Sequence, residues 1–355
     1  MWWDFFVPEG VVGMERWVEW QLRLAPEAIR LTQERYGLLR ELRHEGMKGR
    51  RTLAQKLGMT ERIARQHIDF LKTAGLVDSN NGGVWLTEDG EDALGALGGY
   101  VRNLSGMTAL EERLSEALRL REVIVVPGDS DQDESILQDL GRAGAEILLQ
   151  YMMPQSVVAV GGGSTLAQVV KGVRKQSPEV MVVPARGGLG ENVEVQANTI
   201  AAVLAQGLGG QYRMLHIPDG LTEKAVKLVL ESSPDMREIA ELIRQADILI
   251  QGIGCADEMA KRRRTQSTLL KKIKSSGAVG EAMGYYFDQE GRAVYETGSL
   301  GMKFSELNKI RFVMAVSGGS TKGAAILSVL RAGGQKALVT DEGAAREILK
   351  LIKGK

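Results

Sequence analysis

The segment VVAVGGGST, Val157–Thr165, decides the fold of this chain. A β-branched apolar run meets glycines and hydroxyls, and a helical pattern follows, so the segment predicts a strand, a tight turn and a helix start. Backbone N–H groups at a helix start favour phosphate, and glycine lets a ligand approach the backbone closely. Many strand-to-helix turns of α/β proteins have this composition, so one copy alone is weak evidence for a ligand site.

A second copy of this phrase lies far downstream, where FVMAVSGGST spans Phe312–Thr321. It has the same order of apolar run, glycines and hydroxyls, and a helical pattern again follows. Two copies in one domain favour a functional pair over a coincidence of composition. We therefore expect two anion cradles and a doubly phosphorylated ligand.

Short apolar runs rich in β-branched residues alternate with helical patterns through the second part of the chain. The runs are 123–126, 157–160, 180–183, 214–217, 248–253, 312–316 and 337–339. This alternation is typical of an α/β fold whose parallel sheet is covered on both faces, and we predict a doubly wound, Rossmann-like domain over residues 121–355. Ligands of such sheets bind beyond the carboxyl ends of the strands, so the residues after each run are the candidates for a site.

The length of 355 residues favours two domains. The formal net charge is zero, but the segment Arg40–Leu76 holds nine Lys or Arg against four Asp or Glu, which suits a polyanionic partner. Cys255 is the only cysteine, so an intramolecular disulfide is excluded and a reducing compartment is natural. No apolar run approaches the length of a membrane helix, and we expect a cytoplasmic protein with no membrane partner.

The segment from residue 26 to 90 predicts a winged helix-turn-helix domain. A short helix over 53–57 ends at Gly58, and a second helix spans 61–74, which is the pattern of helix, tight turn, helix. Ile63 and other apolar residues of the second helix are expected to face inward, while its polar face enters the major groove. The candidate base-reading residues are Arg62, Arg65 and Gln66, and the candidate phosphate-binding residues are Arg50, Arg51 and Thr60.

A β-hairpin should follow at once, because Asn81-Gly82 is a strong turn signal between two short apolar runs. A basic, solvated helix pair that does not bind DNA is the alternative for this domain. Residues 1–25 form a Trp-rich N-terminal extension, and residues 91–120 are predicted to be a helical linker that helps subunits associate.

The residues that follow the predicted strands offer candidates for binding a phosphorylated ligand. Arg186 is the preferred phosphate clamp, and Gln196 supplies an amide. In the run Arg262–Thr265, one or two cations are expected to reach the ligand, because three adjacent arginines cannot all point inward. Glu281 is placed to accept hydroxyl protons from a sugar, and Lys322, beside the second glycine turn, supplies a point charge to a second phosphate.

The same segments argue against catalysis. A P-loop places Lys before the hydroxyl residues, and Ser320–Lys322 has the reverse order, so nucleotide hydrolysis is not expected. The acidic segment 129–133 lacks the glycine and glutamate of a calcium loop and is expected to cap a helix. The three histidines, His44, His67 and His216, provide no evident acid and base pair. We expect no catalytic residue, no metal ligand and no cofactor, in a site built to bind.

Several independent motifs together resemble the SorC family of bacterial transcriptional regulators, in particular its repressors of central glycolytic genes. The resemblance runs from about Pro26 to the C-terminus and excludes the Trp-rich start. The motifs that carry it are GRRTLA at 49–54, TER at 60–62, GGGST at 161–165, PARGG at 184–188, GYYF at 284–287 and TDEGAA at 340–345.

This resemblance implies an effector domain related in fold to sugar-phosphate isomerases and deaminases. It also implies fructose 1,6-bisphosphate, or a related sugar phosphate, as the effector, and dimers or tetramers bound to operator DNA. Ser164 stands where relatives often have threonine and keeps the hydroxyl donor. Carried over residue by residue, the effector site comprises Gly162, Ser164, Thr165, Arg186, Gln196, Arg262, Thr265, Glu281 and Lys322. Which of the three adjacent arginines contacts the ligand stays open.

The sequence thus favours an oligomeric repressor whose operator binding is weakened by a phosphorylated sugar. A sugar-phosphate isomerase or deaminase that carries a DNA-binding module is the alternative, and turnover of hexose phosphates would distinguish it. A structural chromosome protein is a third hypothesis, and it would bind DNA without sequence preference or response to an effector.

Overall fold

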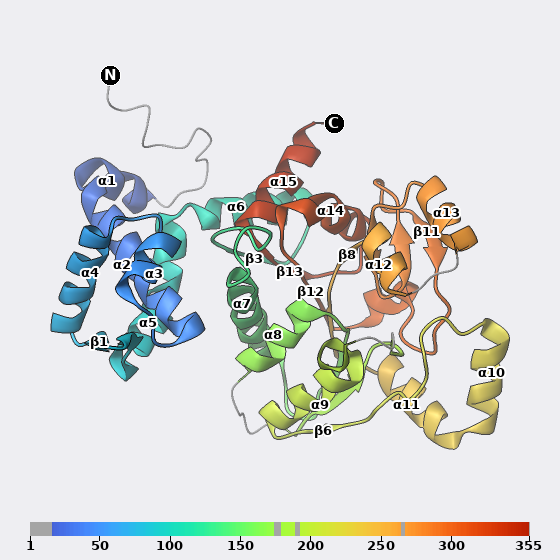
Figure 1. Cartoon of the computed structure of the whole chain (residues 1–355). Helices are drawn as coiled ribbons and strands as arrows, with labels where there is room; N and C mark the ends of the chain where they lie inside the picture. Colours follow the sequence, from blue (N-terminus) through green and yellow to red (C-terminus); the bar gives the residue numbers. More distant parts are fainter. Residues whose placement is uncertain (1–15, 174–178, 189–191, 264–266, 355) are drawn as a thin grey trace. The chain divides into compact units, whose positions relative to one another are not determined.

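The computed structural model describes residues 16–173, 179–188, 192–263 and 267–354. The chain divides into two compact units, Met1–Ala109 and Leu110–Lys355. In Figure 1 the first unit runs from blue to cyan, and the second from green through yellow to red. Within the described ranges, every helix is too short or too polar to cross a bilayer.

The first unit consists of helices and one antiparallel hairpin. Its helix-turn-helix is formed by α3 and α4, and the hairpin β1–β2 follows directly, as the sequence predicts, with Asn81 and Gly82 between the paired residues Asn80 and Gly83. The elements are α1 (Arg16–Leu24), α2 (Pro26–Glu45), α3 (Arg50–Lys56), α4 (Glu61–Thr73), β1 (Val77–Asn80), β2 (Gly83–Leu86) and α5 (Glu88–Leu104).

Local chemistry sets the ends of α4. Gly58, with φ of +62°, makes the left-handed turn before it, a conformation that favours glycine. The Thr60 hydroxyl caps the helix by accepting a hydrogen bond from the backbone N–H of Ile63 over 3.3 Å. Gly75, with φ of +77°, lies just past the end of α4. Beneath the helix lies a core that includes Leu38, Leu53, Ile68, Leu71 and Val84.

One sequence-based prediction for α4 is wrong. Ile63 is 39% exposed, although we expected it to face the core. His67, one turn further along α4, is buried, and its Nε2 lies 2.9 Å from Oε2 of Glu34 on α2. A histidine with a carboxylate partner can be buried there without an unpaired polar atom at Nε2.

The predicted linker, residues 91–120, is divided between the two units. Leu94 of α5 belongs to the core of the first unit, and the hydroxyl of Tyr36 on α2 donates to its carbonyl over 3.3 Å. The boundary between the units falls at Ala109, inside α6 (Met107–Leu118). At the N-terminus, α1 contacts α5 through a hydrogen bond from Gln21 to the Tyr100 hydroxyl. The Trp-rich segment before α1 lies outside the described residues.

The second unit is built on a parallel seven-stranded sheet in the order β3-β13-β12-β7-β4-β5-β6. The α/β fold class is therefore confirmed. Strand β7 lies between β4 and β12, the two strands that lead into the glycine turns. The strands are β3 (Glu122–Val126), β4 (Val157–Val160), β5 (Met181–Pro184), β6 (Gln211–Tyr212), β7 (Ile248–Gln251), β12 (Phe312–Val316) and β13 (Ala337–Asp341).

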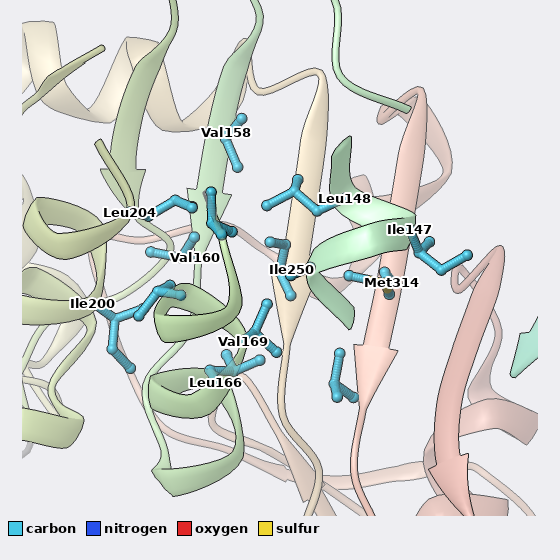
Figure 2. Packing of buried hydrophobic residues seen from close by; sticks show 14 of the residues in the cluster. Ile147, Leu148, Val158, Val160, Leu166, Val169, Ile200, Leu204, Ile250 and Met314 are labelled. Carbon is cyan, nitrogen blue, oxygen red and sulfur yellow. The ribbon is translucent and has the colours of Figure 1, made fainter. Parts of the chain in front are cut away.

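Helices α7 (Ile136–Tyr151), α8 (Ser164–Gly172) and α9 (Ala197–Leu208) cover one face of this sheet. Figure 2 shows their apolar side chains packed against β4, β7 and β12. The opposite face contacts α11 (Pro234–Arg244) at β4 and β5 and α15 (Glu342–Lys353) at β3 and β13. Because both faces are covered, whole strands such as β12 are buried, which is why they are continuous apolar runs in the sequence.

A second, four-stranded antiparallel sheet in the order β11-β10-β9-β8 was not predicted. Its strands are β8 (Gly254–Cys255), β9 (Gly280–Ala282), β10 (Tyr285–Phe287) and β11 (Ala293–Glu296). Around it lie α12 (Ala256–Arg262), α13 (Ser267–Ser275) and α14 (Gly323–Ala332). Strands of two to four residues are too short to show an alternation in the sequence, so this sheet could not be found from pattern alone.

The predicted strand at 214–217 is also wrong. The edge strand β6 ends at Tyr212, before the predicted range, and residues 214–217 are irregular. The Leu215 backbone is paired instead with the side-chain amide of Asn198 on α9, which accepts from Leu215 N–H over 2.9 Å and donates to its carbonyl over 3.0 Å. The Asn198 side chain thus satisfies the backbone N–H and carbonyl of the buried Leu215, as a neighbouring strand would do.

Candidate functional site

One cavity of the second unit lies beyond the carboxyl ends of β4, β5 and β7 and reaches β9 of the small sheet. Its lining brings together residues that are far apart in the sequence. Eight of the predicted effector-binding residues line it, namely Gly162, Ser164, Thr165, Arg186, Gln196, Arg262, Glu281 and Lys322. The ninth, Thr265, lies outside the described residues. The structure places these side chains around one space, and their role as ligand-binding residues remains a prediction.

The first glycine turn opens directly onto this cavity. Gly163, with φ of +121°, precedes the first residue of α8, and its N–H donates to the Val195 carbonyl over 2.8 Å. The N–H groups of Ser164 and Thr165 that follow have no hydrogen-bond acceptor among the described residues. A Cβ at Gly162 would lie 3.0 Å from the same carbonyl. The turn is therefore tight, and it presents unpaired N–H groups at a helix start, where an anion is favoured.

Arg186 is held by the protein itself. Its Nε and Nη2 donate to Oδ1 of Asp219 over 3.2 and 2.6 Å, and Nη2 also donates to the Thr297 carbonyl over 3.0 Å. The Arg186 side chain is 8% exposed and the Asp219 side chain 4%. This geometry does not support the predicted phosphate clamp, because the guanidinium edge that would bind phosphate binds a carboxylate.

Of the three adjacent arginines, Arg262 and Arg263 lie in different environments. The Arg263 side chain is 9% exposed, with Nε 3.3 Å from Oδ2 of Asp219, Nη2 2.9 Å from Oε1 of Glu281, and Nη1 3.2 Å from the Tyr286 hydroxyl. Burial alone would lower the pKa of Arg263, but Glu281, Tyr286 and Asp219 together raise it, so this guanidinium stays charged. Arg262 lines the cavity, is exposed and pairs with no described carboxylate. Arg264 lies outside the described residues.

The second glycine turn is filled by carboxylates of the chain. The N–H of Gly319 donates to Oδ2 of Asp341 over 2.7 Å, that of Ser320 to Oδ1 of Asp129 over 3.1 Å, and that of Thr321 to Oδ2 of Asp131 over 2.8 Å. The expectation that this turn is a second open cradle is therefore wrong. Two carboxylates of the acidic segment, Asp129 and Asp131, thus fill the turn, whereas Asp133 accepts the N–H of Ser135, directly before α7, over 2.9 Å.

Two residues of the cavity lining, Asp219 and Gln251, could not be identified as site residues from the sequence. Asp219 pairs with Arg186 and Arg263, two of the three arginines that line the cavity, yet it lies in an irregular segment with no motif around it. Gln251 ends β7, lines the cavity and is 1% exposed, and neither polar atom of its side-chain amide has a hydrogen-bond partner in the part of the chain that the structure describes. Asn198, which follows Gln196 and lies on α9, is occupied by the Leu215 backbone. These roles depend on which strand ends are adjacent, which only the sheet order determines.

The titratable side chains of the described cavity lining are mainly arginine, lysine and carboxylates. None of the described histidine side chains lines it, since His67 lies in the first unit and the exposed His216 is not among the lining residues. Among the side chains that the structure places, no group of three or more His, Cys, Asp and Glu is positioned to hold a metal ion. The lining includes four cations and three carboxylates, the latter being Asp219, Glu258 and Glu281.

The candidate DNA-binding residues of the first unit all lie on its surface. They are Arg50, Arg51, Thr60, Arg62, Arg65 and Gln66. Arg51 is paired with Glu61, with Nε and Oε1 3.4 Å apart, but both side chains are more than half exposed, so the pair is weak. Thr60 serves as the helix cap described above. Arg62, Arg65 and Gln66 lie on one face of α4, opposite the buried Ala64, Ile68 and Leu71.

Comparison with known proteins agrees with this division. Residues 31–101 match the CggR N-terminal DNA-binding domain. Residues 102–350 match the Sugar-bind family, described as a sugar-binding domain. Two curated relatives carry the name central glycolytic genes regulator. The protein of Priestia megaterium is 40% identical over 340 residues, which cover 95% of this chain and 99% of that protein. The protein of Bacillus subtilis is 39% identical over 339 residues, with the same two coverages.

Solved structures show the same fold. A structure described as a SorC family transcriptional regulator from Enterococcus faecalis is 36% identical, with a TM-score of 0.64, and covers 68% of this chain and 99% of that one. The full-length sorbitol operon regulator SorC from Klebsiella pneumoniae, at 18% identity, has a TM-score of 0.65 and covers 88% of this chain and 96% of that one, and this likeness concerns the fold alone. With relatives of this identity and coverage, the chain belongs to the SorC family of transcriptional regulators, among the central glycolytic genes regulators.

Proposed function

We propose that this protein is a cytoplasmic repressor of central glycolytic genes, and that a phosphorylated sugar, fructose 1,6-bisphosphate, releases it from operator DNA. The observation that carries the effector proposal is the pairing of an open glycine turn at 162–165 with two uncompensated cations around one cavity. Arg262 and Lys322 both line this cavity, and neither forms an ion pair with a described residue. They are free to bind an anionic ligand.

The spacing of the strands supports a ligand with a phosphate at each end. The turn at 162–165 follows β4, and Lys322 follows β12, with only β7 between them. Adjacent strands are about 4.8 Å apart, so the two anchors are separated by roughly 10 Å. An extended hexose bisphosphate has about this span, whereas a triose phosphate is too short to reach both. The second glycine turn does not contribute its N–H groups, so Lys322 supplies the charge there.

The proposed action on DNA requires coupling between the effector cavity and the helix-turn-helix. We infer that the protein acts as a homo-oligomer and that the effector binds the DNA-free arrangement more tightly. A coupling of about 1 to 3 kcal/mol would be typical for such regulators. No turnover of the ligand is part of this proposal, because the described lining residues include no histidine and the buried carboxylates among them are paired with arginines.

The test is a titration of a labelled operator duplex, first selected from random DNA with the full-length protein. Fructose 1,6-bisphosphate should lower the affinity of the protein for this duplex. Lys322→Met should abolish this response and leave the affinity for the duplex in the absence of the sugar unchanged. Lys309→Met removes an exposed cation outside the cavity lining and should respond normally. An operator complex unchanged by millimolar fructose 1,6-bisphosphate would refute the effector assignment. Turnover of hexose phosphates would favour an enzyme.

A further inference from the structure

One apolar side chain of α4 is exposed close to the candidate base-reading residues. Ile63, the third residue of this helix, is 39% exposed. The buried side of α4 is formed instead by residues that include Ala64, Ile68 and Leu71. Covering apolar surface is favourable, so Ile63 offers a contact that a partner of the right chemistry can use.

Ile63 lies at the edge of the polar face of α4. Successive residues of a helix are turned by about 100°, so residues three apart are neighbours on its surface. Gln66 is therefore the neighbour of Ile63, and Arg62 and Arg65 lie on the same exposed side of the helix as Gln66. In a helix-turn-helix, the first residues of the second helix contact base edges in the major groove. Ile63 belongs to this first turn.

The first turn of α4 holds Ile63 in a defined position. The Thr60 hydroxyl accepts a hydrogen bond from the backbone N–H of Ile63 over 3.3 Å and so anchors the start of the helix. A β-branched side chain on a helix has one strongly preferred rotamer about its first torsion. The apolar surface of Ile63 is therefore presented in one direction, and little side-chain entropy is lost when a partner covers it.

The second exposed apolar side chain of α4, Phe70, lies in a different environment. It is 50% exposed, but the guanidinium carbon of Arg35 on α2 lies 3.6 Å from the centre of its ring. Phe70 thus has a cation–π partner within the protein. It also follows Ile63 by seven residues, which places it about 10 Å further along the helix axis. Only Ile63 combines apolar exposure with a position at the start of α4.

We propose that Ile63 contacts the C5-methyl group of a thymine in the major groove, and that this contact makes the protein prefer thymine at that operator position. Residues 31–101 match a DNA-binding domain, so the partner of this helix is DNA. Thymine presents a methyl group in the major groove, and apolar side chains recognise it by contact. The amide of Gln66 suits adenine, so an A·T pair offers a partner to each of the two neighbours. The proposal deepens the operator binding proposed above and rests on it, but not on the effector.

The test replaces single thymines by uracil in the operator duplex selected with the full-length protein. Uracil keeps the base pairing and the O4 acceptor of thymine and removes only the methyl group. At one thymine position or more, this replacement should weaken binding by the unsubstituted protein about fourfold, the effect of leaving one methyl group uncovered. Ile63→Ala should bind the thymine and uracil duplexes equally at that position. Anisotropy titrations at one salt concentration measure both ratios.

Phe70→Ala is the matched control, because it removes the other exposed apolar side chain of the same helix. It should keep the fourfold preference for thymine. Each protein is compared with itself on two duplexes, so a change in folding stability cannot imitate the expected result. Alanine also has the highest helix propensity, and the exposure of Ile63 leaves no cavity when it is shortened, so Ile63→Ala should fold normally.

Equal binding of the thymine and uracil duplexes by the unsubstituted protein at every position would overturn the proposal. A thymine preference that persists in Ile63→Ala would overturn it as well, because the methyl group would then act through another residue or through the shape of the DNA. Ile63→Ala would weaken both duplexes by the same factor if Ile63 contacted a second copy of this chain instead. Failure of operator binding itself would look different, since the unsubstituted protein would then select no duplex from random DNA and both proposals would fall.

Discussion

Thr321 donates both its backbone N–H and its hydroxyl to the same oxygen of Asp131, each over 2.8 Å. Its neighbours Gly319 and Ser320 donate their N–H groups to Asp341 and Asp129. The glycine turn after β12 therefore binds anions, as its composition indicates, but these anions are carboxylates of the same chain. In the matching turn after β4, the N–H groups of Ser164 and Thr165 have no acceptor among the described residues.

The carboxylates in the second turn should differ widely in their contribution to stability. Asp341 is fully buried and accepts from Ser130 N–H, Ser130 Oγ, Gly319 N–H and Ala344 N–H. Asp341→Ala should lower the free energy of unfolding by about 3 kcal/mol, because several buried donors lose their acceptor. Asp131 is exposed, so Asp131→Ala should cost less than about 1 kcal/mol. Urea denaturation of both variants measures this difference, and equal losses would contradict it.

The glycine turn after β12 has features that the sequence predicts and one that it cannot predict. The composition of Ser317–Thr321 predicts the strand, the turn and its affinity for an anion, and all three are present in the structure. It cannot predict which anion, because Asp129 and Asp131 lie about 190 positions earlier in the chain, in hydrogen bonds that span 191 and 190 residues. The loop after β3 reaches the turn only because β13 alone separates β3 from β12 in the sheet.

The two adjacent arginines at the end of α12, Arg262 and Arg263, should separate ligand binding from stability. Arg262→Met should weaken binding of fructose 1,6-bisphosphate about tenfold with little change in the free energy of unfolding, because Arg262 has no carboxylate partner among the described residues. Arg263→Met should instead lower the free energy of unfolding by about 3 kcal/mol or more, since it leaves Asp219 and Glu281 short of a buried partner.

Lys261→Met is the control for both variants, because Lys261 is an exposed cation of the same helix that does not line the cavity. Titration calorimetry and urea denaturation should be unchanged in this control. If Arg263→Met were as stable as the unsubstituted protein and Arg262→Met bound the ligand normally, both assignments would be wrong.

The same pair explains what the sequence leaves open. Three consecutive arginines exclude a common orientation, but nothing in their identity indicates which of them is buried. The choice depends on Glu281 in β9 and on Asp219 after β6, two carboxylates from segments that the sequence does not connect. In contrast, the helix-turn-helix and hairpin of the first unit are local structures, and their caps and turns could be predicted from residues such as Thr60 and Gly82.

The exposed residues of the first unit should divide into those that select a DNA sequence and those that hold the backbone. Arg65→Ala on α4 should lower the affinity for the selected operator by about 1 to 3 kcal/mol and bring it closer to that for random DNA. Arg50→Ala at the start of α3 should weaken both alike and reduce the slope of log K against log salt by about 1. Anisotropy titrations at several salt concentrations measure both effects, and a sequence-selective effect of Arg50 would contradict the division.

Cys255 gives a pH-dependent test of the charges beside the cavity. Burial, followed by the charge of Glu258, raises the pKa of the Cys255 thiol above its ordinary value, and the charge of Lys322 acts in the opposite direction. Because only the thiolate reacts, alkylation by iodoacetamide should be slow at neutral pH and should reach its half-maximal rate above pH 9.0, the ordinary value. Glu258→Gln should lower this midpoint, since it removes a negative charge that opposes ionisation.

Lys322→Met should move the midpoint the other way, because it removes a positive charge that stabilises the thiolate. The unfolded protein in urea is the reference, and there the thiol should titrate near its ordinary pKa in all variants. If a bisphosphate binds at Lys322, it neutralises that cation, so saturation with fructose 1,6-bisphosphate should raise the midpoint of the unsubstituted protein and leave that of Lys322→Met nearly unchanged. A midpoint that responds equally to the ligand in both proteins would show that the phosphate does not bind at Lys322.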